Sequence, residues 1–207
     1  MAILRVAQLG HPVLRLVAEP VTEEELASEY FQQFCEDLLE TMDEYDGAGL
    51  AAPQVHVSKR MVVLTLSDEV GPEFLINPVI TVLTEDTRQT WEGCLSVEGM
   101  RGLVERPDHI RVDALDRYGQ PIAYELQGFP AVVTQHECDH LDGVLYIDKA
   151  IPRSMMFVSE YRRWGPPEEF VDIDEEDYSE DDMVDDGYLE ELTDERDLLD
   201  VSDHGAD

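Results

Sequence analysis

Two stretches of the chain carry apolar residues at helical spacing. Residues 22–45 repeat apolar side chains every three or four positions, which predicts a helix with one face in the core. Thr22 followed by Glu25 is the pattern of a capping box at the start of this helix. A second helix is predicted over 130–142, where Gly143 suits the residue that follows a helix end. A shorter, third helix is expected over 151–164.

Short apolar runs between turn residues predict strands. The tight turn RYGQP joins two of these runs into a hairpin, and Pro78 makes part of another run an edge or a break. A Gly-rich connection is expected over 46–55, and 88–96 leads into a loop. The predicted strands cover 61–66, 74–83, 109–116, 122–128 and 144–148.

The order of helix, strands and helix favours an α+β fold. We expect mainly antiparallel sheets packed around the central helix 130–142, with the helix 22–45 as an N-terminal element. The chain has 207 residues, of which 43% are hydrophobic, enough for one well-packed domain. Every apolar run is too short to span a bilayer, so no membrane association is expected.

Charge divides the chain into two parts. The net charge is −34, and residues 165–207 contain 20 acidic residues against one basic residue. We expect 1–164 to form the folded catalytic domain and 165–207 to be a mostly disordered acidic tail, with a transient helix over 189–199. The acidity of both parts disfavours binding to nucleic acid or anionic membranes. It fits either a protein kept soluble in high salt or an ordinary acidic protein.

Cysteine usage indicates a reducing compartment. Three widely spaced cysteines, Cys35, Cys94 and Cys138, do not form the pattern of a disulfide framework. Polar residues interrupt the N-terminal segment where a secretory signal needs an unbroken apolar run. These features predict a cytoplasmic protein whose thiols are free to bind metal.

The segment QHECDHLDG (135–143) contains the pattern H-E-x-x-H. On a helix, His136 and His140 lie on one face and can bind a single ion. Glu137 lies beside them and can accept a proton from water at that ion. A helix with two surface histidines explains the same pair of residues about equally well.

A catalytic metal site needs a third protein ligand. Cys94 is the candidate, because a thiolate binds metal strongly, although a free cysteine is more commonly a small buried hydrophobe. Cys138 is two positions from each histidine, faces the other side of the helix and is interpreted as packing. Three carboxylates could orient an imidazole: Glu92, Asp139 and Asp142.

Three motifs together resemble a known family. GAGLAAPQ (47–54), EGCLS (92–96) and QHECDHLDG (135–143) are similar, in order and spacing, to the three signature motifs of bacterial peptide deformylases. The resemblance extends over about residues 3–164. It implies a hydrolase that removes the formyl group from the formylmethionine of newly synthesised proteins. It also implies one divalent metal ion, natively Fe²⁺, although the ligand types permit Zn²⁺, Ni²⁺ or Co²⁺ as well.

The resemblance also assigns roles to residues. It implies that Cys94, His136 and His140 bind the metal, that Glu137 is the general acid and base, and that water activated by the metal attacks the formyl carbon. The oxyanion donors it implies are the Gln54 side chain and the Leu95 backbone N–H. The candidate substrate-binding residues are Gly49, Gly93, Arg101, Val132 and Val133. Glu98 departs from the family pattern, since many members have proline there.

Two other functions remain as alternatives. A metallopeptidase would need a histidine or glutamate ligand downstream of His140, and it would give Cys94 and Gln54 no role. A non-enzymatic metal-binding module would act through the acidic tail. That tail could instead associate with a basic partner such as the ribosome surface, or serve only solubility.

Overall fold

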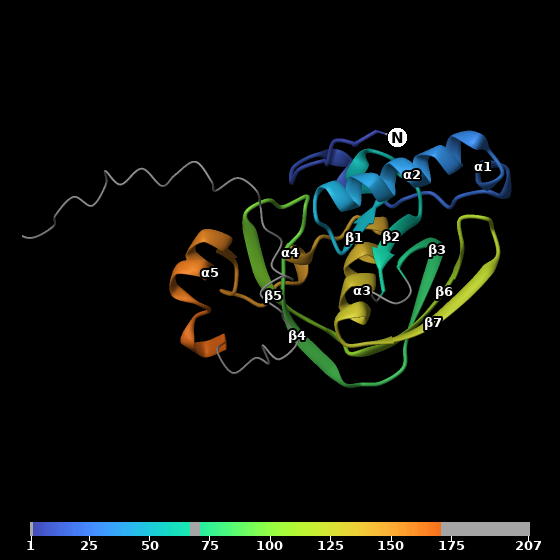
Figure 1. Cartoon of the computed structure of the whole chain (residues 1–207). Coiled ribbons are helices and arrows are strands. Elements are labelled where there is room, and N and C mark those ends of the chain that lie inside the picture. The colour runs from blue at the N-terminus through green and yellow to red at the C-terminus, as the bar shows by residue number, and fades with distance from the viewer. Residues whose placement is uncertain (1, 67–70, 171–207) are drawn as a thin grey trace, which may run out of the picture.

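The computed structural model describes residues 2–66 and 71–170 of the chain (Figure 1). The helices are α1 (Glu23–Leu26), α2 (Glu29–Glu44), α3 (Phe129–Leu141), α4 (Tyr146–Lys149) and α5 (Val158–Trp164), and the 3₁₀ turns are η1 (Pro12–Arg15), η2 (Ala52–Val55) and η3 (Glu168–Phe170). The strands are β1 (Gly49–Ala51), β2 (Met61–Thr65), β3 (Pro72–Val82), β4 (Thr87–Glu92), β5 (Met100–Pro107), β6 (His109–Leu115), β7 (Pro121–Gln127) and β8 (Met156–Phe157).

Two antiparallel sheets border the central helix α3. The larger sheet has the strand order β1-β2-β3-β6-β7 and the smaller one the order β4-β5-β8. Helix α3 contacts strands of both sheets, and Figure 1 shows it in the middle of the molecule. Its residues Val133 and Leu141 pack into a core cluster with residues of β2, β3 and β6. The predicted α+β class, with antiparallel sheets around this helix, is confirmed.

The N-terminal helical region differs from its prediction in one respect. Residues 22–45 form two helices rather than one, because Ser28 caps a new helix by accepting a hydrogen bond from the Phe31 N–H at 3.1 Å. The capping box of Thr22 and Glu25 is present at the start of α1. The apolar face of α2 is buried, as its spacing predicts.

Pro78 lies at an irregularity in β3 rather than at its end. The pairing of β3 with β6 shifts register between Ile76 and Val79, and Asn77 has a positive φ of 53°. The Asn77 side chain is held by Val21, whose N–H donates to it and whose carbonyl accepts from it, both at 2.9 Å. The break predicted at the proline is therefore a local bulge in one continuous strand.

The strand predicted over 144–148 is wrong. Gly143, at φ 71°, turns the chain, and the Asp148 carboxylate accepts a hydrogen bond from the Leu145 N–H at 2.9 Å. This contact favours a helical turn, and the segment forms α4. A run of four apolar residues is compatible with a strand and with a buried turn, and periodicity alone does not distinguish the two.

Other boundaries also shift. The predicted connection 46–55 contains β1 and η2, and residues 88–96 begin with β4 before their loop. Strand β5 had no sequence prediction, because its polar residues hide the alternation that marks a strand. Only the second half of 151–164 is helical, since Met156 and Phe157 pair with β5 first.

The expected tail lies mostly outside the described residues. This holds for the predicted disorder of 171–207 and for the transient helix over 189–199. Within the described ranges, no helix combines the length and apolar character needed to cross a membrane.

Candidate active site

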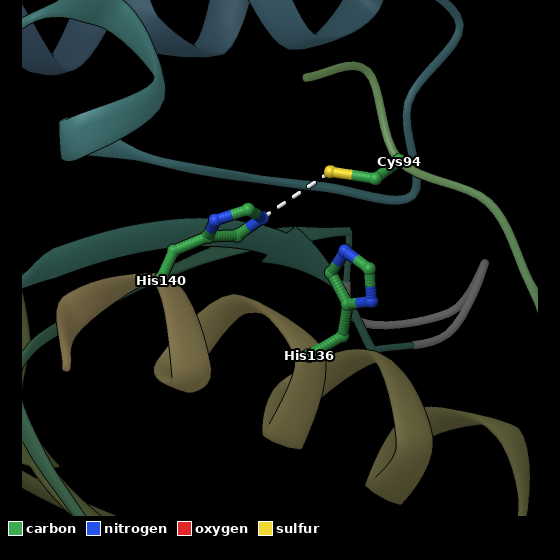
Figure 2. A group of neighbouring side chains, drawn as sticks. All are labelled: Cys94, His136 and His140. Atoms are coloured by element: carbon green, nitrogen blue, oxygen red, sulfur yellow. Dashed lines mark hydrogen bonds between the residues drawn. The ribbon is translucent and has the colours of Figure 1, made fainter. Parts of the chain in front are cut away.

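The structure brings together three potential metal ligands from distant segments. Ligand atoms of Cys94, His136 and His140 all lie within 4.8 Å of one another, and Cys94 Sγ is 3.3 Å from His140 Nε2 (Figure 2). Both histidines come from the same face of α3, as their spacing predicts, and Cys94 follows β4. A thiolate and two imidazoles at these separations suit a first-row transition metal, so the residues fit the implied ion.

A buried charged network orients His136. The His136 Nδ1–H donates to Glu92 Oε2 at 2.8 Å, which leaves Nε2 for a metal. The buried Arg106 side chain donates from Nη2 to the same Glu92 oxygen at 2.9 Å. It also donates from Nη1 to Asp139 Oδ2 at 2.9 Å. Although burial alone would raise the pKa of Glu92, the hydrogen bonds from Arg106 and His136 lower it to about 2.

Of the three carboxylates considered from sequence, only Glu92 contacts a histidine among the described residues. Asp139 pairs with Arg106 and with Lys149, and Asp142 pairs with Arg60. Their spacing from the histidines places both on α3 or at its end, but they face other partners. Arg106 was missed from the sequence, because nothing in a strand-like run marks an arginine as buried.

Cys138 lies outside the ligand group. It is buried, and burial raises the pKa of its thiol to about 12, so it is a neutral packing residue. Its assignment to packing agrees with the structure. Tyr146, for which no role at the site was predicted from the sequence, stacks on the His136 ring with centroids 6.0 Å apart.

Glu137 is buried beside the ligands without a cationic partner. Its Oε2 has no hydrogen-bond partner, and burial raises the pKa of its carboxyl to about 7. Gly49 on β1 makes room for this side chain: a Cβ at Gly49 would lie 2.7 Å from Glu137 Cγ. Position 49 therefore requires glycine, because the Glu137 side chain lies too close to this backbone to leave room for a Cβ.

Gln54 and Leu95 reach the same site from η2 and from the loop after Cys94. The buried Gln54 side chain accepts a hydrogen bond from the Ala51 N–H at 2.8 Å, which fixes the orientation of its amide. Its Nε2 donates to Ser96 Oγ at 3.3 Å and points to Cys94 Sγ at 3.6 Å. Within the described part of the chain, the Leu95 N–H donates no hydrogen bond.

A cleft of about 800 Å³ opens onto these residues. It is lined by Glu137 and Gln54 and by two of the three potential metal ligands, Cys94 and His136. Val132 and Val133 of α3 are buried in its wall. All five substrate-binding candidates line it: Gly49, Gly93, Arg101, Val132 and Val133.

The sequence matches a family model over most of its length. The model of the polypeptide deformylase family covers residues 3–155, including every residue described at this site. The chain belongs to the polypeptide deformylase family. The family is metal-dependent, and its activity, removal of the formyl group from N-formylmethionine peptides, is the activity of this deformylase.

Relatives and solved structures agree with this assignment. A peptide deformylase of Pseudomonas aeruginosa is 48% identical over 149 residues, which cover 72% of this chain and 87% of that protein. The crystal structure of peptide deformylase from Thermotoga maritima has a TM-score of 0.69 at 41% identity and covers 73% of this chain and 100% of that one. A Met-Ala-Ser-bound deformylase structure from Acinetobacter baumannii has a TM-score of 0.67 at 36% identity, covering 72% and 98%.

Proposed function

We propose that Cys94, His136 and His140 hold the metal ion and that Glu137 moves the proton in deformylation. The single observation that carries this proposal is the position of the buried Glu137 carboxylate, whose Oε2 has no hydrogen-bond partner, beside three mutually close ligand atoms. The bound ion supplies Lewis acidity, which polarises the formyl group and acidifies water in the site. We propose Fe²⁺ as the native ion, with Zn²⁺, Ni²⁺ or Co²⁺ as functional substitutes.

Glu137 is suited to accept and return one proton. Burial holds the pKa of its carboxyl at about 7, near the pH at which a general base works best. We assign Glu137 to take the proton of the attacking water and deliver it to the leaving amine. Gly49 supports this assignment by leaving the carboxylate space next to β1.

Gln54 and Leu95 are proposed as the donors to the negative charge that develops on the formyl oxygen. The Ala51 N–H holds the Gln54 carbonyl oxygen, so the Nε2 donor is turned toward the cleft. A neutral amide donates without competing for the proton of Glu137. Removing one such donor typically lowers kcat by about 10²- to 10³-fold.

The substrate is proposed to be an N-formylmethionyl chain with its methionine side chain against Val132 and Val133. Both valines line the cleft one turn before His136, and an apolar wall favours an unbranched thioether side chain. Gly49, Gly93 and Arg101 are assigned to the path of the peptide. The Met-Ala-Ser ligand of the Acinetobacter baumannii relative supports a peptide in this cleft.

Formate release distinguishes this function from its alternatives. Anaerobically purified protein, loaded separately with Fe²⁺, Ni²⁺, Co²⁺ and Zn²⁺, is given formyl-Met-Ala-Ser and an unformylated peptide of the same sequence. We expect formate from the formylated peptide with no cleavage of a peptide bond. Peptide-bond cleavage without formate would indicate a metallopeptidase, and metal binding without either reaction would indicate a binding module.

Residues 165–207 are proposed to be a separate acidic tail appended to the catalytic domain 1–164. We propose a cytoplasmic enzyme whose tail contacts basic surfaces at the ribosome, where formylated chains emerge. A deletion ending at Gly165 should keep its turnover of formyl-Met-Ala-Ser and lose ribosome co-sedimentation. Unchanged co-sedimentation would leave solubility as the role of the tail.

A further inference from the structure

Two arginines at the cleft lack a carboxylate partner, whereas seven other arginines in the described part of the chain have one. The chain contains 48 acidic and 14 basic residues. Arg5 and Arg101 line the cleft, and in the described part of the chain neither forms an ion pair. Arg163, which lies over Trp164, is outside the cleft lining. The arginines paired with a carboxylate are Arg15, Arg60, Arg88, Arg106, Arg111, Arg117 and Arg153.

The Arg101 side chain lies against an aromatic ring rather than against a carboxylate. Its guanidinium carbon lies 4.8 Å from the centroid of the Tyr161 ring, and its Nε is buried without a hydrogen-bond partner. An aromatic face attracts a cation without neutralising it. Arg101 is therefore oriented while its charge and remaining donors stay available to a ligand.

The C-terminal segment builds this arrangement. Strand β8 pairs with β5 through Arg101 and Met156, and α5 follows it directly. The Tyr161 ring packs on Trp91, with centroids 5.2 Å apart, and Trp91 also lines the cleft. Figure 1 shows α5 beside β4 and β5, and its first residue, Val158, is itself in the cleft wall. The matched family model ends at residue 155, before this segment.

We propose that α5 completes the substrate cleft, with Tyr161 as a positioning residue that holds Arg101 to bind an acidic side chain downstream of the formylmethionine. The inference rests on the proposed path of the peptide past Arg101. A guanidinium without a carboxylate of its own matches a carboxylate by charge and by its paired donors. Glu98 at the same cleft does not pair with Arg101, so the guanidinium remains open to the substrate.

The test uses amidated formyl peptides with Glu or Gln at each of the three positions after methionine. The measured quantity, for the full-length, metal-loaded enzyme, is the ratio of kcat/KM for a Glu peptide to kcat/KM for its Gln counterpart, taken at the position where this ratio is highest in the wild type. In Arg101→Ala this ratio is expected to fall about threefold, as for a partly exposed ion pair. Tyr161→Ala should lower the ratio similarly, mainly through KM. Tyr161→Phe should keep it, because the ring remains, and Trp164→Ala, on the same helix, should not change it.

A double-mutant cycle separates positioning from general damage to α5. If Tyr161 acts through Arg101, Tyr161→Ala adds nothing to the Glu-to-Gln ratio in the Arg101→Ala background. A further fall there, or a Tyr161→Ala defect confined to kcat, would overturn the positioning role. An unchanged ratio in Arg101→Ala would overturn the carboxylate site. Absence of formate release from every peptide by the wild type would instead contradict the proposed function.

Discussion

Two buried glutamates lie within the same site and have opposite surroundings. Glu92 accepts hydrogen bonds from Arg106 and from His136, and its pKa is lowered to about 2. Glu137 has an oxygen without any partner, and burial raises its pKa to about 7. One carboxylate is therefore fixed in its ionised form, whereas the other can exchange a proton near neutral pH.

The difference follows from which strand each residue faces. Glu92 lies at the end of β4, and Arg106 lies on β5, the strand that pairs with β4. The Arg106 guanidinium offsets the free-energy cost of burying the negative charge of Glu92. Glu137 faces β1, where Gly49 offers space but no cation. Burial alone does not determine the chemistry of a carboxylate, because the partner decides whether it holds a ligand or moves a proton.

The largest expected effect comes from Glu137→Gln, which keeps the shape and removes the base. Turnover of formyl-Met-Ala-Ser should fall by about 10²- to 10⁴-fold, the usual contribution of a positioned general acid and base. Metal content, measured by elemental analysis, should stay at the wild-type level because all three proposed ligands remain. Loss of metal in this variant would assign Glu137 to binding rather than to proton transfer.

Arg106→Met breaks the other half of the comparison by removing the partner of Glu92. Leaving that carboxylate buried without its cation should lower the free energy of unfolding by about 3–5 kcal/mol, measured by urea denaturation. Arg111→Met, which removes an exposed pair with Asp113, is the matched control and should leave the free energy of unfolding nearly unchanged, because solvent screens this pair. Equal losses in the two variants would contradict a stabilising buried network.

Gly49→Ala should move the Glu137 carboxylate without replacing its chemical group. The added Cβ would lie 2.7 Å from Glu137 Cγ, so the side chain must shift. A displacement of this size should lower kcat by about 10²-fold while the metal remains bound. Turnover equal to that of the wild type would show that the position of Glu137 is not critical.

The smallest effect is a pH dependence of stability with opposite sign for the two glutamates. In metal-free protein, the raised pKa of Glu137 should lower the free energy of unfolding as pH rises from about 4.5 to about 7, because the unfolded chain releases this proton first. The lowered pKa of Glu92 contributes stability that is lost as pH falls from about 4.5 toward 2. Urea denaturation at a series of pH values should therefore show the stability of Glu137→Gln rising relative to that of the wild type only between about pH 4.5 and pH 7.

The sequence predicts the local parts of this site better than its long-range parts. Helical spacing is enough to place His136 and His140 on one face, and the family motifs bring in Cys94 and Gln54. The capping box at Thr22 and the positive φ at Gly143 follow from residue type. These features depend on neighbours within a few positions, which is where pattern carries information.

Contacts across sheets are harder to read. Arg106 was missed because its burial depends on Glu92 and Asp139, which arrive from a neighbouring strand and from α3. The strand predicted for 144–148 was wrong because a side-chain contact from Asp148 decides that turn. No role for Tyr161 could be predicted from the sequence, since its partner Arg101 lies 60 positions earlier. The two residues come together only because β5 pairs with β8.

The rate of formate release per bound metal, compared between Glu92→Gln and Glu137→Gln, tests the contrast between the two glutamates most directly. Glu92→Gln should bind metal about 10- to 100-fold more weakly, as for other groups that orient a histidine ligand, and should keep most of its turnover once loaded. Glu137→Gln should bind metal normally and release formate at least about 10²-fold more slowly per metal. Equal rates per bound metal in the two variants would contradict the assignment of separate roles.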